Sequence, residues 1–385
     1  MRFLEVLRAE AKLIFSDIAI VLTVIGGVIL YAFLYPQPYA SQSVSKLSVS
    51  VVDLDRSQVS REIAFKLNAT PQISIKRNDM SHRDAKEALL RGEVQAIVLI
   101  PKNFSKDLKQ HLSPVIAVGA DSSYFLIYGA VLEGAMKAVL TQSATLKVGR
   151  LLVSGEPLEK ARKAYTPYKL QIINLFNKNN SYTQYVIPAV YIIILQQTML
   201  IGLGILGGGI NERLVRREDG HYTRAPIWMM MTSRYIIFGA LFFLHMLFYF
   251  GFSFSFFEVT HLANIADLLN LGVAFITACI FFGIFLGSIF NAREVATPII
   301  LFSSLPLVFS VGFIWPQEAI PTFIQNLSLL SPSTPAMQGF LRLNQMGAEF
   351  GAVVPQYVIL WLQALIYAIL GYYYINKNRK KYVTN

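Results

Sequence analysis

Residues 235–257 read YIIFGALFFLHMLFYFGFSFSFF, a stretch of 23 residues without a charged side chain. About 20 predominantly apolar residues of helix cross the hydrocarbon core of a bilayer, so this stretch is long enough to span it. Further uncharged runs of comparable length occupy residues 18–45, 181–210, 268–292, 295–317 and 350–376. The sequence therefore predicts a polytopic α-helical membrane protein with six transmembrane helices.

The bulk composition agrees with a membrane protein. Of the residues, 54% are hydrophobic and 15% are charged, against about 25% charged in typical soluble proteins. The net charge is +11, but no segment interleaves basic and aromatic residues as a nucleic-acid surface does. We therefore expect membrane lipid, and no nucleic acid, among the partners. The single cysteine and five scattered histidines predict neither an intrachain disulfide nor a metal site.

Lysine and arginine in short loops set the orientation of the spans. If the N-terminus is cytoplasmic, the cytoplasmic segments carry thirteen such residues, and the short outer loops carry one, Arg342. The thirteen are Arg2, Arg8, Lys12, Arg213, Arg216, Arg217, Arg224, Arg234, Arg293, Lys377, Arg379, Lys380 and Lys381. The asymmetry predicts that both termini are cytoplasmic.

One more uncharged run, residues 319–341, competes for the role of a span. It contains several Ser, Thr, Gln and Asn side chains, which are costly in lipid. Three prolines also interrupt it: Pro321, Pro332 and Pro335. A seventh span would place the basic tail, residues 377–385, outside. The run is therefore predicted to form two short helices, broken near Ser331–Pro332, within a re-entrant outer segment at residues 316–349.

A long segment of soluble character, residues 37–180, separates the first two spans. β-Branched runs predict strands at residues 47–52, 72–75, 94–100 and 115–118, and helical patterns occupy residues 58–67, 83–91, 104–111 and 125–154. This alternation predicts an inserted extracytoplasmic α/β domain with a small mixed sheet. Asp53, Asp55 and Asp121 lie near predicted strand ends, where ligand sites occur. Asp also forms turns there by bonding its own backbone, which is the interpretation we favour.

These patterns divide the chain into five parts. They are an amphipathic cytoplasmic interface helix at 1–16, a first transmembrane helix at 17–36, the extracytoplasmic domain at 37–180, transmembrane helices two to six at 181–376, and a basic cytoplasmic tail at 377–385. An alternative for residues 1–16 is that they simply begin the first span.

The cytoplasmic loop 210–234 joins the second and third spans. From residue 211 it reads NERLVRREDGHYTRAP, which crowds charge of both signs into a predicted short helix ended by Gly220. Membrane anchoring needs only the basic residues, so the acidic ones among them favour docking to a soluble partner. The predicted docking residues are Glu212, Arg213, Arg216, Arg217, Glu218, Asp219 and Gly220.

Over nearly its whole length the chain resembles the membrane subunits of type 2 ABC exporters, in the subgroup with a large extracytoplasmic domain after the first span. The resemblance rests on the layout of spans, on VVDLD at residues 51–55, on residues 189–209 before the charged loop, and on the Pro-rich double turn at 316–345. The family loop commonly reads Glu-x-x-x-Gly-Thr with a later Pro. Here residues 218–223 read EDGHYT, a departure from that pattern, and Pro226 follows.

The resemblance implies a permease subunit of the bacterial inner membrane. It would have no ATPase of its own, and the sequence contains no phosphate-binding loop. A cytoplasmic ABC ATPase, carrying ATP and Mg²⁺, would dock on the loop residues above, and this chain would bind no cofactor itself. A second copy or a homologous permease would complete a dimeric pathway. In Gram-negative relatives the outer domain can meet a periplasmic adaptor and an outer-membrane channel.

Polar side chains inside spans are costly and often functional. Gln196, Gln197 and Thr198 are therefore candidates for the translocation path, although hydrogen bonding between helices explains the two glutamines equally well. Five glycines at residues 202–209 would allow close dimer packing or a hinge. The resemblance implies that the double turn lines the outer exit, with Pro316, Glu318, Pro332 and Pro335. A mainly apolar path would suit an amphipathic or hydrophobic, lipid-like substrate.

Two other functional classes compete with transport. A membrane-anchored receptor or scaffold would use the outer domain, but it would not explain five further closely spaced spans. An intramembrane enzyme is the weakest alternative, because the uncharged runs hold no Asp, Glu, Lys or Arg for acid–base chemistry.

Overall fold

The computed structural model describes residues 2–39, 45–110, 112–122, 124–155, 157–160, 176–177, 181, 183–312, 314–315 and 317–383. The chain divides into two compact units. A helical unit comprises Met1–Gln42 and Asn174–Asn385, and a sheet unit comprises Ser43–Ile173.

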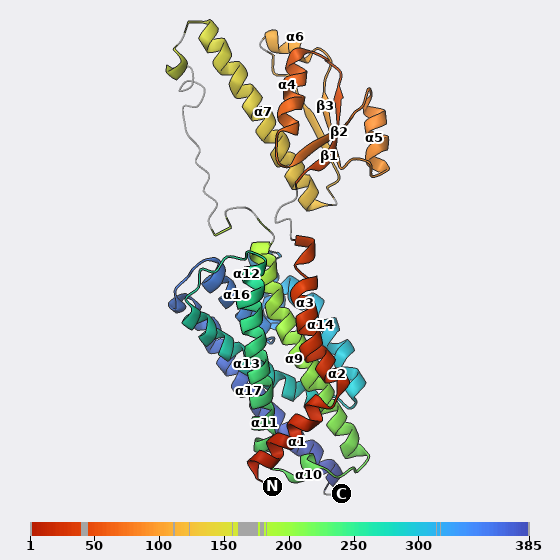
Figure 1. The fold of residues 1–385 in the computed structure, drawn as a ribbon, viewed down its shortest axis with the longest axis vertical. Helices are drawn as coiled ribbons and strands as arrows, with labels where there is room; N and C mark the ends of the chain where they lie inside the picture. The colour runs from red at the N-terminus through yellow and green to blue at the C-terminus, as the bar shows by residue number, and fades with distance from the viewer. Residues whose placement is uncertain are drawn as a thin grey trace. The chain divides into compact units, whose positions relative to one another are not determined.

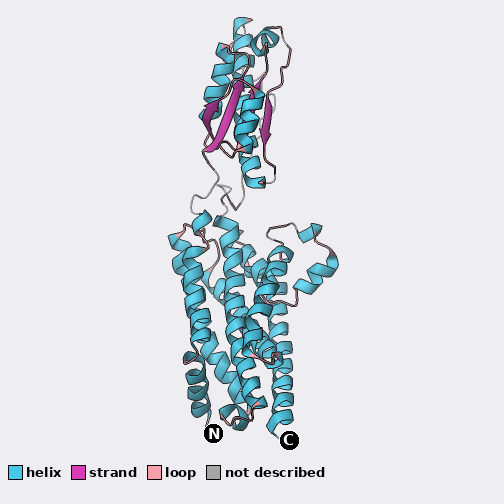
Figure 2. Cartoon of the chain, turned by 90° about the vertical axis from the view of Figure 1, so that its right-hand side faces the viewer, coloured by secondary structure: helices cyan, strands magenta, loops and turns pink. Residues whose placement is uncertain are grey.

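The helical unit consists of long helices that run side by side (Figure 1, Figure 2). Its helices are α1 (Phe3–Phe15), α2 (Ile18–Val21), α3 (Val28–Leu34), α9 (Thr183–Val215), α10 (His221–Arg224), α11 (Ile227–Leu247), α12 (Phe254–Phe256), α13 (Ile265–Ile289), α14 (Ala296–Ser310), α15 (Thr322–Ser328), α16 (Ser333–Phe340) and α17 (Val354–Val383). π-Helical turns at Leu22–Gly27 and Phe248–Ser253 join α2 to α3 and α11 to α12 without a break.

Six helical stretches among the described residues are long and apolar enough to cross a membrane. They are Ile18–Tyr39, Val186–Val215, Ile227–Phe256, Ile265–Ile289, Arg293–Ser310 and Phe350–Tyr382. Each overlaps one predicted run. Several helices extend past the charged residues at which the predicted runs stop. A charged side chain does not end a helix as long as the backbone N–H and C=O groups remain paired within it. Arg234, expected in a cytoplasmic loop, thus lies inside α11.

Helix α9 forms the centre of the helical unit. Its apolar window is entirely buried, and it packs against α13, α14 and α16. The backbones of α9 and α13 touch where a glycine of one meets a glycine of the other. A Cβ at Gly207 would lie 2.5 Å from the Gly287 carbonyl carbon, and a Cβ at Gly287 would lie 2.6 Å from the Leu203 oxygen. These glycines therefore serve packing within the chain, a role not considered in the predictions of dimer contact or hinge.

Two asparagines close the end of α13. Asn211 on α9 donates from Nδ2 to the carbonyls of Ser288 at 3.1 Å and Phe290 at 2.8 Å. Asn378 on α17 donates to the Ser288 carbonyl at 2.8 Å and to Asn211 Oδ1 at 3.2 Å. The last carbonyls of a helix have no partner within it, so these side chains satisfy them and tie three helices together.

The segment before the last long helix contains two short helices, as predicted. They are α15 and α16, and the turn between them spans residues 329–332. Pro332 is the N-cap of α16, a position that tolerates a residue without an N–H donor. A π-helical turn at Leu341–Gln345 follows.

Among its described residues the sheet unit contains four strands, β1 (Leu47–Asp53), β2 (Ile73–Asn78), β3 (Ala96–Ile100) and β4 (Ala117–Ala120), in the order β2-β1-β3-β4. The pairs β1–β2 and β1–β3 are parallel, whereas β3–β4 is antiparallel. All four predicted strands are present. The helices are α4 (Gln58–Asn68), α5 (His82–Leu90), α6 (Phe104–Lys109) and α7 (Phe125–Val153).

Alternation along β1 and β3 buries both faces of the sheet. Val51 and Val98 pack with α4 and α7 on one face, and Val52 and Ile97 pack with α5 on the other. Figure 1 shows α4 and α7 on one side of the sheet and α5 on the opposite side. At the end of β1, Asp53 accepts hydrogen bonds from the Asp55 backbone N–H at 3.0 Å and from the Ser60 hydroxyl at 2.6 Å. These contacts support turn formation as the role of Asp53.

Candidate functional site

Helix α9 ends in a closing turn built on an arginine. The Glu218 N–H donates to the Arg213 carbonyl at 2.9 Å, and the Arg217 N–H donates to the Leu214 carbonyl at 3.1 Å. This pair of bonds is the Schellman motif, whose residue after the cap adopts the left-handed conformation and is usually Gly. Here that residue is Arg217, with φ of 58°. An exposed arginine thus holds a backbone position that favours glycine.

The short helix α10 begins at Gly220, which corrects the expectation that Gly220 ends a helix. Residues 211–215 are the last residues of α9, and α10 comprises the four residues His221–Arg224, after Gly220. A Cβ at Gly220 would lie 2.4 Å from the Tyr222 ring, so the close ring contact excludes a side chain there. The Thr223 hydroxyl donates to the Asp219 carboxylate at 2.7 Å. That bond and the nearby Arg224 guanidinium lower the pKa of Asp219.

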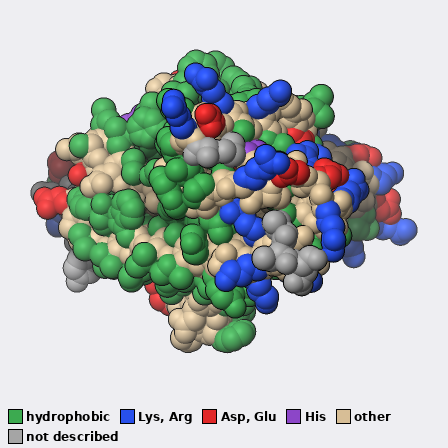
Figure 3. Space-filling model, turned by 90° about the horizontal axis from the view of Figure 1, so that it is seen from below, with side chains coloured by type: hydrophobic (Ala, Val, Ile, Leu, Met, Phe, Trp, Pro, Cys, Tyr) green, Lys and Arg blue, Asp and Glu red, His purple; other side chains and the backbone are tan. Residues whose placement is uncertain are grey.

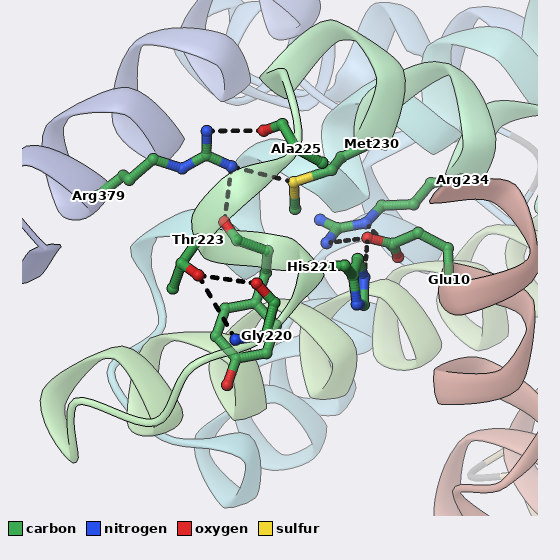
Figure 4. A network of polar contacts seen from close by, with 9 residues as sticks. Glu10, Gly220, His221, Thr223, Ala225, Met230, Arg234 and Arg379 are labelled. Atoms are coloured by element: carbon green, nitrogen blue, oxygen red, sulfur yellow. Dashed lines mark hydrogen bonds and ion pairs between the residues drawn. The ribbon is translucent and has the colours of Figure 1, made fainter. Parts of the chain in front are cut away.

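One arginine from the last helix holds the end of α10. Arg379 on α17 donates from Nη1 to the Ala225 carbonyl at 2.8 Å and from Nη2 to the Tyr222 carbonyl at 2.6 Å (Figure 4). Its Nη2 also lies 3.2 Å from Met230 Sδ on α11. A four-residue helix is too short to be stable alone. Arg379 therefore fixes α10 against α17 and α11.

A buried acid on α1 holds the other side of α10. Glu10 is fully buried, and its carboxylate accepts from Arg234 Nε at 3.0 Å and Nη2 at 3.1 Å (Figure 4). The same carboxylate lies 3.0 Å from His221 Nε2, on α10. Glu10 lies between Val6 and Ile14 on the buried stripe of α1, so the stripe faces α11 with one carboxylate at its centre. Three elements thus meet at one bidentate ion pair.

The charge state of Glu10 follows from its neighbours. Burial alone would raise the pKa of its carboxyl. The Arg234 charge and the hydrogen bonds from His221 and Arg234 outweigh burial, so the pKa of Glu10 lies below its usual value. The carboxylate is therefore ionised at neutral pH. The pair is also almost sealed from water, because only 5% of the Arg234 side chain is exposed.

We call Glu10, His221, Arg234 and Arg379 the clamp around α10, and residues 216–226 the connection between α9 and α11. The charged side chains of the connection form an exposed surface beside the clamp. Arg216 and Glu218 pair at 4.0 Å, and Asp219 pairs with Arg224. A surface pocket of about 390 Å³ lies among these residues, with Tyr382 of α17 in its wall. Figure 3 views this end of the molecule and shows basic side chains gathered there with acidic ones among them. Charge of both signs around a concave surface suits a partner with complementary charges.

The predicted docking residues fall into two groups. Arg216, Arg217, Glu218 and Asp219 are exposed, whereas Gly220 is partly buried beside Tyr222. Arg213 and Glu212 are partly buried as well. Glu212 points within the chain, where its carboxylate accepts from the Arg293 N–H at 3.1 Å.

Arg293 extends this internal network to the start of the first long helix. It pairs with Asp17 at 2.9 Å, and Asp17 caps α2 by accepting from the Ala19 N–H at 3.0 Å. Glu212 therefore belongs to a structural network that joins the ends of three helices.

Four residues of the clamp were missed by sequence reasoning: Glu10, His221, Arg234 and Arg379. The excess of Lys and Arg in cytoplasmic segments assigns Arg234 and Arg379 only an orienting role. One sequence signal was available, because Glu10 interrupts the apolar positions of an amphipathic helix at the spacing of Val6 and Ile14. Its partner, 224 residues away, could not be found from that spacing.

The three candidate path residues face different surroundings. Gln196 is fully buried and reaches the turn between α15 and α16, where its Oε1 accepts from the Ser333 N–H at 2.7 Å and its Nε2 donates to Ser331 at 2.8 Å. Thr198 bonds back to its own helix, at the Ile194 carbonyl. Gln197 is 5% exposed, and neither polar atom of its side chain has a partner among the described residues.

The predicted exit residues lie in or near the two short helices. Pro332 and Pro335 begin α16, and Pro335 is buried. Glu318 lies in a short 3₁₀ turn, Gln317–Ala319. Pro316 lies outside the described residues.

The apolar helices and their charged end define a multi-pass helical membrane protein. The chain belongs to the ABC-2 transporter family, since a family model described as ABC-2 family transporter protein matches residues 18–373. It is therefore a membrane component of the ABC-2 type, a permease subunit rather than an ATPase, and works with an ABC ATPase partner. A search of curated proteins gave no match.

Proposed function

We propose that the chain is the permease of an ATP-driven exporter in the bacterial inner membrane, with six spans and both termini in the cytoplasm. Two permeases, identical or homologous, form the pathway, and a cytoplasmic ATPase carrying ATP and Mg²⁺ drives it. The sheet unit is then extracytoplasmic. The family match and the excess of Lys and Arg in the short loops on one side support this assignment.

The connection between α9 and α11 is the proposed ATPase docking site. The observation that carries this proposal is Arg217, an exposed arginine with φ of 58°. A non-glycine residue in this conformation costs about 1 kcal/mol, which glycine would avoid. Strained positions cluster at functional sites. We infer that the Arg217 charge is used by a partner, together with Arg216, Glu218 and Asp219.

The clamp around α10 is the proposed transmission element. A displacement of the connection by the ATPase would move α1 through the contact of His221 with Glu10. It would move α11 through Arg234 and α17 through Arg379. Because a buried bidentate pair is rigid, these helices would move with α10 and pass on the movement of the ATPase. Helix α1 would also lie at the membrane interface, since Leu4 and Phe15 are exposed on it.

The path and its outer exit are proposed from the polar groups at the centre of the unit. Gln196 joins α9 to the α15–α16 turn, so movement of α9 would reach the proposed exit at Glu318, Pro332 and Pro335. Gln197 carries unpartnered amide atoms and remains a candidate path residue. The largely apolar surroundings favour an amphipathic or hydrophobic, lipid-like substrate. In a Gram-negative cell the sheet unit would contact a periplasmic adaptor and an outer-membrane channel, as the resemblance to the exporter family implies.

The test is co-purification of the ATPase with charge-reversed permease. The tagged chain is purified from its native membranes in mild detergent, and bound ABC ATPase and ATP hydrolysis are measured. We expect Arg217→Glu to lower both by fivefold or more, since the reversed charge repels its acidic partner. Arg217→Gly should lower ATPase binding while stabilising the permease by about 1 kcal/mol.

The matched control is Arg83→Glu, which reverses an exposed arginine of the sheet unit whose described ion pair is with Glu87 one turn away. It should leave both measurements unchanged. Equal loss in both variants, or no ABC ATPase with the wild-type chain, would contradict the docking proposal.

A further inference from the structure

The sheet unit contains a groove that the transport proposal does not use. The groove measures about 800 Å³ and lies between α4, α6, β4 and α7. Ile63 of α4, Phe104 of α6 and Val118 of β4 line it, and residues 132–150 of α7 line it along one side. Ligand pockets of proteins range from about 300 to 1,000 Å³. The groove therefore has the size of a small-molecule site, and all of its walls belong to this one unit.

The wall from α7 is apolar and open to solvent along much of its length. Leu132, Met136 and Leu140 follow one another at intervals of one turn, and they are 37%, 53% and 57% exposed. These three positions span about 12 Å along the helix. Across the groove, Leu112 is 57% exposed. Large apolar side chains exposed together on both sides of a concave surface mark a binding groove.

The same wall becomes cationic beyond the apolar stretch. Lys147 and Arg150 line the groove, and the described lining residues include no Asp or Glu. Lys147 lies about 10 Å past Leu140 along the helix axis. Arg150 donates to the Leu108 carbonyl of α6, which holds its positive charge at the rim. The groove is therefore amphipathic along its length, with an apolar body and a positive end.

We propose that the groove binds a single-chain amphiphile with an acidic head group, such as a fatty acid. The acyl chain lies along Leu132, Met136 and Leu140, and the carboxylate lies at Lys147 and Arg150. Charge complementarity selects an anion over a cation or a neutral lipid, and the concave apolar body selects an acyl chain over a hydrophilic anion. The proposal does not depend on ATPase docking, because every contact lies within the sheet unit.

The test uses the full chain in nanodiscs and a 16-carbon fatty acid that carries a diazirine on its acyl chain. After irradiation, the labelled peptides are mapped by mass spectrometry. We expect labelling of α7 between Leu132 and Leu140, displaced by palmitate. Palmityl alcohol at the same concentration should displace at least threefold less probe, because it lacks the charge that Lys147 attracts. Labelling elsewhere, or equal displacement by the alcohol, would overturn the proposal.

Paired variants locate the site. Lys147→Glu should reduce α7 labelling about fivefold, since it replaces attraction with repulsion. The matched control is Lys137→Glu on the same helix, which lies outside the groove lining and pairs with Glu133. It should leave labelling unchanged.

A third variant, Ser143→Trp, fills the groove from an exposed position, so the fold should tolerate it and labelling should be lost. A circular dichroism spectrum like the wild type confirms that each variant is folded. Unchanged labelling in Ser143→Trp, or equal loss in the two lysine variants, would overturn the proposal.

Discussion

Replacing Glu10 by Gln tests whether the buried pair holds α1 on the helical unit. The change preserves shape and one acceptor oxygen but leaves the Arg234 cation unpaired, with its side chain 5% exposed. Removing one partner of a buried ion pair typically costs about 3–5 kcal/mol, because the remaining charge cannot be solvated. Helix α1 is also held by the packing of Val6 and Ile14 and by the stacking of Phe3 on Trp228, whose ring centroids lie 6.4 Å apart.

The assay is hydrogen exchange of the α1 amides, followed by mass spectrometry in nanodiscs. A loss of 3 kcal/mol raises the opening equilibrium about 150-fold, so α1 should lose at least that much protection. Glu5→Gln makes the same chemical change at an exposed position of α1 and should alter protection less than threefold, since Gln also serves a capping box.

A double variant separates the unpaired charge from lost packing. Glu10→Met with Arg234→Met replaces the pair by apolar side chains of similar length, and such replacements are often neutral. It should restore α1 protection to within about tenfold of the wild type. Protection within tenfold of the wild type in Glu10→Gln alone, or no recovery in the double variant, would refute the reasoning.

Contacts elsewhere in the helical unit, and the titration of Glu10, also have measurable consequences. Gly207→Ala should destabilise the detergent-solubilised protein by about 1–3 kcal/mol in a melting curve, because the new Cβ would lie 2.5 Å from the Gly287 backbone. The control Gly209→Ala should be neutral or stabilising, because the nearest atom to its Cβ is 4.0 Å away. Gln196→Leu should cost about 1–3 kcal/mol by leaving its buried partners unpaired, whereas the same change at Gln197 should not destabilise; equal effects would contradict the assignment. Folding lowers the pKa of Glu10, so the stability that its ionised carboxylate gives to α1 should be constant from pH 7 to 5 and be lost as pH falls below about 4. Hydrogen exchange of the α1 amides should show this loss in the wild type but not in Glu10→Gln.

Properties that depend on local chemistry were predictable from the sequence. The apolar helices follow from runs without charge, because hydrocarbon excludes ionised side chains whatever their neighbours. The strands of the sheet unit and the two short helices around Pro332 follow from β-branched runs and from proline, whose effects act within a few residues. The charged connection was also located, but its helix was placed on the wrong side of Gly220, since Tyr222 decides that contact.

Properties that depend on which segments meet were decided only by the tertiary structure. Glu10 and Arg234 are 224 residues apart, and neither sequence neighbourhood indicates the other. The close backbone contact of Gly207 on α9 likewise depends on Gly287 of α13, which is distant in the sequence. A buried ion pair or a backbone contact forms only when two helices far apart in the sequence pack together. That packing depends on how the two helix surfaces fit, which no single stretch of sequence shows. The sequence by itself thus determined the membrane helices and the soluble insertion, and the fold decided how one acid and two arginines clamp α10.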